Sequence, residues 1–456
     1  MPSSRRRFLT VSAAVGAALA GCTNRNGSTD SPGDVPSESP SERRRPSPDD
    51  ASPPTQTPRD PRPLDVGGTW PQRGFGPGHA GVAPATGVSD DGDAYWQLRR
   101  ARSGPPLLAD GRLFHFGLTG DDTQGVPTLT ETPSTGTGHR PEGTLTLFCR
   151  DARDGRRLWV RRLPGRTRSG VATAGRVLVA GDGFVAAYRT DDGREAWRED
   201  LGERRATVDT AVDGTALVST AIVRESARKP DVRAYRVTDG TPRWKQPSPK
   251  WQAALAASSE TVLSLSAQFQ VGSVLTARSL VDGSERWSVD LDDNGIPAGP
   301  FATEGTAYVA PDDGGVHAFD LADGTRRWHY DAATTNRVGF AASAEEAYLV
   351  DDGRLRVVDP TDGSERWSVT PTGGDDGFGG APAVGRDAIY LQKGGYPAYF
   401  VALSRADGSE RWSSRLPETT VEGDMVMSGL GAQPVVAAGA VYAFAHDGLY
   451  AFGPAQ

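Results

Sequence analysis

Acidic and amide side chains at alternate positions mark one stretch of the sequence as a possible cation site. Asp290, Asp292 and Asn294 precede a glycine, which is the spacing of the first half of a calcium-binding loop. Such a loop ends with a bidentate glutamate at its twelfth position, where this sequence has Phe301. We therefore expect an acidic turn here, with a calcium site at these three residues as the alternative.

Residues suited to other kinds of catalysis are scattered along the chain. None of the six histidines forms a short-range metal pair; we expect His79 to be fixed by hydrogen bonds and His317 to be half-buried. The two cysteines, Cys22 and Cys149, are too few for a disulfide framework or a multi-cysteine zinc site. There is no Gly-x-Ser-x-Gly elbow, although a serine triad assembled from distant segments is compatible with the sequence. We expect no catalytic residue, metal or cofactor, and the question of enzyme activity stays open.

The charge and composition of the chain restrict its partners. The formal net charge is −8, whereas nucleic-acid binding requires a basic stripe, so we expect no nucleic acid. Lysine is rare and acidic residues are abundant, which is typical of salt-loving organisms.

The dominant pattern is a repeat of the form Asp-Gly-x-x-x-Trp. Its spacing is about forty residues, which is typical of propeller blades or helical arrays. In each unit, alternating apolar and polar runs of four to six residues are separated by turn clusters such as Asp-Gly. This alternation predicts strands, and Asp-Gly predicts hairpins in which both turn residues have positive φ. The repeats end at Trp96, Trp159, Trp197, Trp244, Trp287, Trp328, Trp367 and Trp412.

These units predict an all-β fold, an eight-bladed β-propeller of four-stranded antiparallel blades. The first strand of each unit is rich in small residues, as expected for strands crowded around an axis. We expect the repeat tryptophans to have a structural role and to pack between neighbouring blades. The chain after Trp412 supplies only three strands, so we expect the N-terminal strand at Asp91 to complete the last blade and close the ring.

The first residues predict export and lipid attachment. A basic cluster with Arg5 and Arg6 precedes an apolar run that is short for a membrane span, as in a twin-arginine signal. Leu-Ala-Gly-Cys ending at Cys22 is similar to a lipoprotein cleavage site, with an ordinary signal and a chance cysteine as the alternative. We expect a signal peptide at 1–21, a disordered tether rich in proline and serine at 22–64, and the propeller at 65–456.

The repeat resembles that of the pyrroloquinoline-quinone repeat propellers, whose blades end in the same Asp-Gly and Trp pattern. The segment from Trp70 to Gly81, with a Trp-Pro start and a later His-x-Gly, is also similar to the start of these propellers. The family includes quinone-dependent alcohol and sugar dehydrogenases, which use calcium, and a non-enzymatic lipoprotein that assists the assembly of outer-membrane barrels. The resemblance therefore implies a propeller and leaves both functions open.

Several features of the dehydrogenases are missing from this chain. Many of the alcohol enzymes carry a disulfide between adjacent cysteines, and this sequence has no adjacent pair. It also lacks a Cys-x-x-Cys-His haem motif, and its blades are close to minimal length. Quinone with calcium is accordingly expected only if the chain is a dehydrogenase.

Four long connections interrupt the repeat and are the candidates for binding. Those at 119–143, 221–231 and 393–400 separate the middle strands of a unit, so we expect them to share one face. The connection at 417–433 precedes a first strand, and we expect it to open onto the opposite face. Tyr396, Tyr399 and Phe400 stand beside glycines and predict a contact surface.

These observations give three hypotheses for function. The first is a propeller anchored to the cell membrane by a lipid on Cys22, monomeric and extracytoplasmic, which acts as a non-catalytic scaffold for other extracytoplasmic proteins. The second is a quinone-dependent dehydrogenase of alcohols or sugars. The third is a module that binds carbohydrate or another small ligand at a mouth of the channel.

Overall fold

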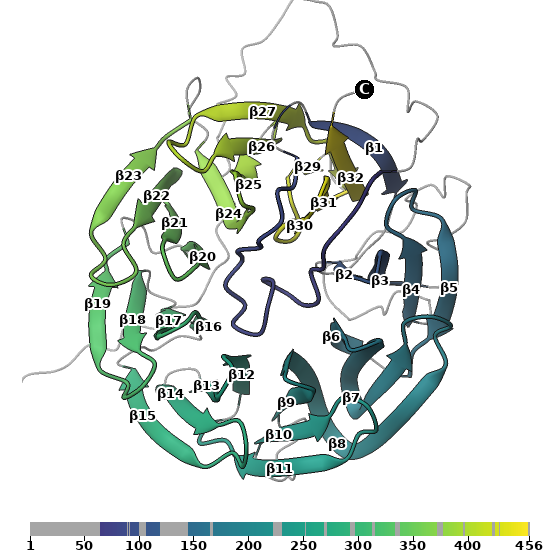
Figure 1. The fold of residues 1–456 in the computed structure, drawn as a ribbon, viewed down its shortest axis with the longest axis vertical. Coiled ribbons are helices and arrows are strands. Elements are labelled where there is room, and N and C mark those ends of the chain that lie inside the picture. The colour runs from purple at the N-terminus through teal and green to yellow at the C-terminus, as the bar shows by residue number, and fades with distance from the viewer. Residues whose placement is uncertain are drawn as a thin grey trace, which may run out of the picture. The chain divides into compact units, whose positions relative to one another are not determined.

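The computed structural model describes residues 64–88, 90, 92–99, 106–118, 145–164, 167–221, 230–250, 252–268, 271–291, 297–311, 315–332, 338–371, 377–394, 397–421, 425–427 and 429–454. They belong to one compact unit, Thr57–Gln456. All the regular elements formed by these residues are strands, arranged radially around an axis (Figure 1). The predicted all-β propeller with antiparallel blades is therefore confirmed.

Six of the radial sheets have four strands in an antiparallel meander, and in each the first strand in the blade lies nearest the axis (Figure 1). Their strands are β30 (Val435–Ala437), β31 (Ala440–Ala445), β32 (Gly448–Pro454) and β1 (Gly92–Arg99); β2 (Leu107–Ala109), β3 (Arg112–Leu118), β4 (Leu145–Asp151) and β5 (Arg157–Arg162); β12 (Gln252–Ala257), β13 (Thr261–Gln268), β14 (Gly272–Ser279) and β15 (Glu285–Leu291); β16 (Ala298–Ala302), β17 (Thr306–Ala310), β18 (Val316–Asp320) and β19 (Arg326–Tyr330); β20 (Gly339–Ala342), β21 (Ala347–Asp351), β22 (Arg354–Val358) and β23 (Glu365–Val369); β24 (Phe378–Val384), β25 (Ala388–Lys393), β26 (Tyr399–Ser404) and β27 (Glu410–Arg415).

The seventh radial sheet has six strands, and a two-stranded ribbon forms a separate sheet. The six strands are β6 (Thr167–Thr173), β7 (Arg176–Arg189), β8 (Glu195–Val212), β9 (Thr215–Ala221), β10 (Asp231–Arg236) and β11 (Pro242–Pro247). The ribbon pairs β28 (Thr419–Val421) with β29 (Met425–Met427).

The prediction of eight separate blades is wrong, because the described strands form seven radial sheets. The difference arises at β8, which is 18 residues long and has two sets of partners. Its first part pairs with β7, and its second part, from Arg205 to Val212, pairs with β9. Two tryptophan repeats, ending at Trp197 and Trp244, consequently share one continuous sheet, which the count of sequence motifs could not reveal.

The ring closes where the sequence predicted. β1 pairs antiparallel with β32, so Gly92 lies opposite Pro454 and Arg99 lies opposite Gly448. An N-terminal strand thus completes the sheet whose other three strands come from the C-terminus (Figure 1). Asp91 itself lies outside the described residues.

The repeat tryptophans join neighbouring units, as predicted. Each indole lies against the glycine of the next Asp-Gly turn around the ring: a Cβ added to Gly283 would come within 2.6 Å of Trp244, and one added to Gly324 within 2.7 Å of Trp287. The same contact recurs from Trp412 to Gly92 across the closure. In six units the indole N–H also donates to a carbonyl of the following unit, with acceptors Thr190, Val237, Leu280, Leu321, Pro360 and Val88 at 2.8–3.0 Å.

The joint at Trp96 has an arrangement of its own. Trp96 lies against Gly155, but its buried indole nitrogen has no hydrogen-bond partner. The carbonyl of Ala152, which stands where the other units place the acceptor, instead accepts a 2.8 Å hydrogen bond from the Tyr442 hydroxyl. Tyr442 belongs to the same sheet as Trp96 and packs on its ring.

The Asp-Gly turns have a different geometry from the one predicted. Seven of the eight motif glycines have positive φ, such as 72° at Gly283, with Gly92 as the exception, and none of the described motif aspartates has. The Asp282 carboxylate accepts a hydrogen bond from the amide of Ser284 at 3.0 Å, which is the local bond typical of aspartate in turns. Both turn residues have positive φ in four other hairpins, for example Asp213 with Gly214.

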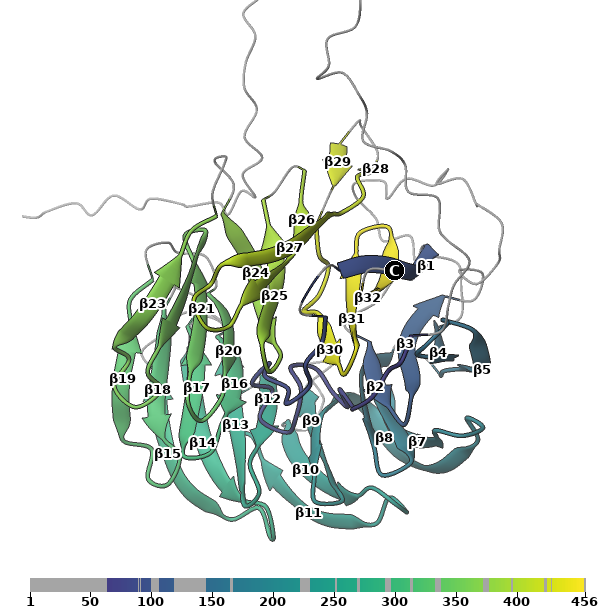
Figure 2. The same cartoon turned by 45° about the horizontal axis from the view of Figure 1, so that its top comes forward.

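The turns of each unit are divided between two faces. The first and last turns of a unit bind each other at one face, as where the Leu280 amide donates to Glu260 and the Val237 amide donates to Gly214. In an antiparallel meander the middle connection and the link to the next unit must then lie at the other face. The Leu430 amide donates to the Gln392 side chain at 2.8 Å. Leu430 lies in the link before β30, and Gln392 lies at the end of β25, next to the middle connection of its sheet. The prediction that the 417–433 connection opens onto the opposite face is therefore wrong (Figure 2).

The contact between tryptophan and glycine gives a stability prediction. Gly283 and Gly175 both have positive φ, 72° and 68°, but an added Cβ meets Trp244 at Gly283 and nothing within 4 Å at Gly175. Replacement by alanine should cost about 1–2 kcal/mol of backbone strain at either site. We expect Gly283→Ala to lose a further 1–3 kcal/mol, roughly, because the indole must move. Urea unfolding measures both variants, and equal losses would contradict the proposed joint.

Candidate functional site

Residues 64–88, called here the axial segment, cross one mouth of the ring in front of the inner strands (Figure 1). The segment hydrogen-bonds to all seven radial sheets. Trp70 and Leu108 exchange two backbone bonds of 2.7 and 2.8 Å, and Gly67 and Ala438 exchange another pair. The remaining inner strands donate to the segment through the amides of Ala172, Ala211, Ala257, Ala302, Ala342 and Val384.

Small residues on both sides make this contact possible. Five of the six donors are alanines near the end of an inner strand, and the ring backbone can therefore approach closely. On the segment, Gly78 accepts from the Ala302 amide at 2.8 Å, and a Cβ at Gly78 would lie 1.9 Å from the Ala302 carbonyl oxygen. The small residues in the first strand of each unit predicted crowding around the axis. The sequence did not show that the segment from Trp70 to Gly81 contributes to this crowding.

His79 is held by backbone carbonyls, as the sequence analysis expected. Its Nδ1 lies 2.5 Å from the Arg73 carbonyl oxygen and its Nε2 lies 3.0 Å from that of Leu255, on β12. Burial lowers the pKa of His79, and the nearby Arg73 guanidinium also lowers it. The residue adopts a φ of 55°, so the backbone of the segment turns sharply at this point.

Asp209 is the residue of this region that sequence reasoning missed. It lies on β8 at a β-bulge, where the pairing with β9 shifts between Val208 and Thr210. Its carboxylate accepts hydrogen bonds from Ser219, at 3.1 Å from the amide and 2.6 Å from the hydroxyl. Burial nevertheless raises the pKa of Asp209 to about 7. The signal in the sequence was an aspartate inside an apolar inner strand, Ala-Thr-Val-Asp-Thr-Ala-Val.

Gln72 connects the axial segment to the same strand. Its side-chain oxygen accepts from the Ala211 amide at 3.0 Å and from the Thr210 hydroxyl at 3.1 Å. The side chain is only 1% exposed, and its amide nitrogen has no hydrogen-bond partner. Thr210 also lies 3.1 Å from the Pro77 carbonyl oxygen. The wall next to Asp209 is therefore covered by the segment.

The described residues do not assemble the predicted cation site. Asp290 lies on the outermost strand β15 with its side chain exposed, and Asp292 and Asn294 lie outside the described residues. No group of three His, Cys, Asp or Glu side chains among the described residues could hold a metal ion. Asp209, on β8, accepts its two printed hydrogen bonds from Ser219.

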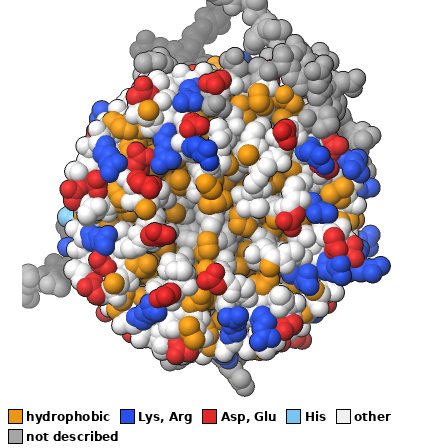
Figure 3. All heavy atoms as spheres, in the orientation of Figure 1, with side chains coloured by type: hydrophobic (Ala, Val, Ile, Leu, Met, Phe, Trp, Pro, Cys, Tyr) orange, Lys and Arg blue, Asp and Glu red, His pale blue; other side chains and the backbone are white. Residues whose placement is uncertain are grey.

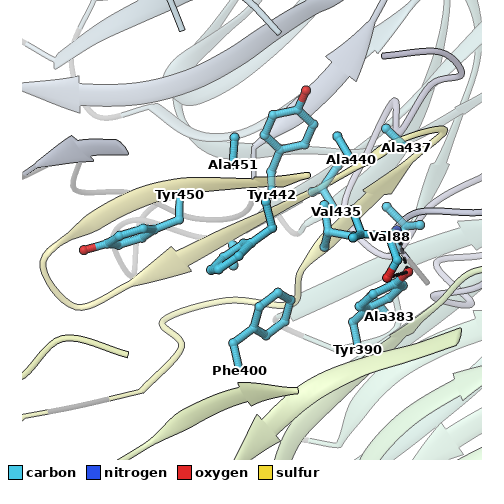
Figure 4. Close-up of a cluster of buried hydrophobic side chains, with 14 of the residues drawn as sticks. Val88, Ala383, Tyr390, Phe400, Val435, Ala437, Ala440, Tyr442, Tyr450 and Ala451 are labelled. Atoms are coloured by element: carbon cyan, nitrogen blue, oxygen red, sulfur yellow. Dashed lines mark hydrogen bonds between the residues drawn. The ribbon is translucent and has the colours of Figure 1, made fainter. Parts of the chain in front are cut away.

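The predicted contact loop is only partly a surface. Phe400 is fully buried, so its prediction as an exposed contact residue is wrong. Its ring packs 5.6 Å from Trp412 and 4.9 Å from Phe452, inside the cluster shown in Figure 4. The glycines that suggested a loop precede β26, and alternation on that strand directs Phe400 into the core. Tyr399 is half-buried against apolar neighbours, and Tyr396 lies outside the described residues.

The described cysteine and the remaining histidines have structural surroundings. Cys149 is buried, and burial raises the pKa of its thiol to about 12, which makes it unreactive. His317 is half-buried, as predicted, and stacks 6.2 Å from His329. His115 accepts a 3.0 Å hydrogen bond from Arg150.

Several predicted features fall outside the described residues. These are the signal arginines Arg5 and Arg6, Cys22, the tether up to residue 63, and the connection at 119–143. Within the described ranges, no helix has both the length and the apolar character needed to cross a membrane.

The contact at Gly78 gives a second prediction. We expect Gly78→Ala to displace the segment from β16, because an added Cβ would overlap the Ala302 carbonyl. Gly67→Ala is the matched control on the same segment, since its added Cβ would meet only the Ala438 side chain, at 3.4 Å. Hydrogen exchange at the Ala302 amide should accelerate in the first variant and not in the second. Unchanged exchange in Gly78→Ala would show that this bond does not hold the segment.

Comparison with known proteins agrees with this architecture. The family profile described as outer membrane protein assembly factor BamB matches residues 85–246, 228–378 and 377–456. A search of curated proteins finds no match.

Solved structures with the same fold have different functions. Quinohemoprotein alcohol dehydrogenase from Comamonas testosteroni aligns at 13% identity over 85% of this chain and 81% of its own, with a TM-score of 0.58. BamB from Moraxella catarrhalis aligns at 14% identity over 80% and 100%, with a TM-score of 0.50. The designed Ika8 protein aligns at 13% identity over 82% and 99%, with a TM-score of 0.56. At these identities the likeness establishes the fold, and the profile match over most of the chain shows that it belongs to the pyrroloquinoline-quinone repeat family described as outer membrane protein assembly factor BamB.

Proposed function

We propose that this chain is a non-catalytic scaffold that binds other proteins outside the cytoplasm. The observation that carries the proposal is the axial segment, whose hydrogen bonds reach all seven radial sheets. These bonds tie the inner strands together and occupy one mouth of the ring with the protein's own backbone. A rigid ring of this kind is suited to presenting its connections to partners. The family match supports this reading, since BamB is described as an assembly factor.

The location follows from the N-terminal sequence pattern. The twin-arginine-type signal at Arg5 and Arg6 supports export of the folded ring, and the motif ending at Cys22 supports a lipid anchor in the cell membrane. The proline-rich stretch up to residue 64 would serve as an extended tether. We propose that the tethered ring acts as a monomer.

The face opposite the axial segment is the better candidate for docking. The middle connections and the links between units lie there by the antiparallel topology of the described strands. The axial face, seen in Figure 3, has an uncharged and apolar centre, with charges of both signs distributed around it. Its centre is already engaged by the segment.

An assay for quinone-dependent activity tests the scaffold proposal against the dehydrogenase hypothesis. The described residues include no group of three His, Cys, Asp or Glu side chains that could hold a metal ion, and on the scaffold proposal we expect none of the dye reduction with alcohols or sugars that a dehydrogenase would show. The measurement is dye reduction by the purified chain after incubation with quinone and calcium, with a known quinone dehydrogenase as the positive control. Saturable turnover that depends on quinone would overturn the scaffold proposal.

Two exposed valines give a matched test of the docking face. Val271 precedes β14 and is 54% exposed, whereas Val281 follows the same strand and is 83% exposed. They therefore lie on opposite faces of one blade. A photo-crosslinking residue at 271, on the face opposite the axial segment, should capture a defined membrane or secreted protein in native cells, and the same residue at 281 should capture little. Capture only at 281 would assign docking to the axial face, and capture at neither position would contradict the proposal.

A further inference from the structure

The hairpin of β4 and β5, residues 151–162, is the most basic of the eight repeat hairpins, counted from three residues before Asp-Gly to three after Trp. It carries five arginines and two aspartates, whereas the hairpins at 320–331 and 359–370 carry more acidic than basic residues. The sign of the charge is therefore reversed locally in a chain of net charge −8. Blue side chains gather along this edge of the ring in Figure 3, where Figure 1 places β5.

The same hairpin departs from the repeat at the residue before the tryptophan. Five of the eight motifs have arginine there, and this one has Leu158. The arginine of a regular unit is tied to its own sheet: Arg327 donates to the Asp320 carboxylate at 2.7 Å and to the Thr306 hydroxyl at 2.8 Å. A leucine can make neither bond, so the outer strand β5 has an apolar side chain where other units have a paired cation.

The pairing of the strands shows where the cation of this unit has gone. Thr306 lies opposite Asp320 in its sheet, and Arg112 lies opposite Asp151 in the equivalent pair of β3 and β4. An arginine on β3 thus replaces the threonine, and the outer strand keeps Leu158. Leu158 is 37% exposed, and among the described residues it is the one exposed large hydrophobic side chain that lies within a strand.

Leu158 is surrounded by a surface of mixed apolar and basic character. Side chains alternate along β5, so Val160 and Arg162 lie on the same side of the strand as Leu158. Val160 is half-buried and Arg162 is exposed. Arg161, on the other side, donates to the Gly193 carbonyl at 2.5 Å and holds the strand against the next unit. The result is an apolar centre on a fixed strand with a cation at its end.

The turn of the hairpin adds basic groups at the opposite end of this surface. Arg153 and Arg156 are 59% and 65% exposed. Asp151 lies 3.3 Å from Arg153, and Asp154 lies 3.8 Å from Arg156, so two of the five positive charges are offset within the hairpin. The remaining excess is positive, and a guanidinium can bind a further carboxylate through its free N–H groups.

We propose that this surface of β5, with Leu158 at its centre, binds an acidic segment of a partner protein that also presents an apolar side chain. The inference rests on the proposed scaffold function and names the kind of partner. An apolar contact surrounded by arginine pairs is the usual composition of a protein-binding surface. The surface is one strand wide at the edge of the ring, which fits an extended segment better than the plane of a membrane.

Fluorescence anisotropy of a labelled peptide that repeats Glu-Glu-Leu, titrated with the full chain, tests the proposal. Binding should be saturable and should weaken as salt is added, because exposed charges are screened. Leu158→Ala should weaken it by at least about fivefold, and Arg162→Glu by a similar or larger factor. A peptide that repeats Glu-Glu-Ser should bind more weakly, and one that repeats Lys-Lys-Leu should not bind.

Two matched variants control for side-chain loss and charge reversal elsewhere. Val281→Ala truncates an apolar side chain that is 83% exposed, and Arg194→Glu reverses an arginine that is 79% exposed in the turn of the next unit. Both should bind the peptide like the unmodified protein. Tryptophan fluorescence checks folding, and Arg162→Gln replaces Arg162→Glu if that variant differs.

Three results would overturn the proposal. These are no binding of the Glu-Glu-Leu peptide, binding that Leu158→Ala and the Arg162 variant leave unchanged, and binding of phosphatidylglycerol vesicles without binding of the peptide, which would assign the surface to a membrane. Cross-linking from residue 271 is independent of this surface. Its success together with failure here would leave the scaffold function in place and remove only the acidic partner at β5.

Discussion

The fold depends on one repeated contact, the indole of one unit lying on the glycine of the next. A side chain at that glycine would overlap the ring, so only glycine permits the approach. The same turn supplies a carbonyl for the indole N–H in six units, and the contact therefore fixes both distance and orientation. The joint works equally between separate sheets and within the six-stranded sheet. The ring can thus keep its geometry even where two repeats merge.

The axial segment and the tryptophan joints hold the ring together at different distances from its axis. The joints act at the periphery, where the tryptophans lie, whereas the segment acts at the axis, where the inner strands converge. Most of its bonds run between backbone groups, which requires small residues on both sides and leaves little room for side-chain chemistry at that mouth. The side chains of Gln72 and His79 also bond to the ring, and they lie beside Asp209 in the sector of the six-stranded sheet and β12. The chain thus places its unusual polar residues beside the place where the regular repeat is least regular.

Much of this architecture could be predicted from the sequence because it is local and periodic. The Asp-Gly-x-x-x-Trp repeat predicted strands, turns, the position of the tryptophans and closure by the N-terminal strand. It could not predict the number of sheets, because β8 continues from one repeat into the next through an unbroken ladder. It also placed Phe400 on a surface, since neighbouring glycines outweighed the alternation of β26. Asp209 escaped notice because its environment is built by Leu255, Ser219 and the segment, which are distant in sequence.

The residues that hold the propeller together are different from those in its variable connections. For this reason the chain can resemble both a dehydrogenase and an assembly factor in structure. The features shared among such propellers are those that hold the ring together, and they constrain the joints and the inner strands. The connections at the opposite face are not needed for closure, so they are free to differ. A function can then change without disturbing the tryptophan joints. We therefore expect the activity of this chain to depend on the residues that depart from the repeat, both in those connections and in the axial segment.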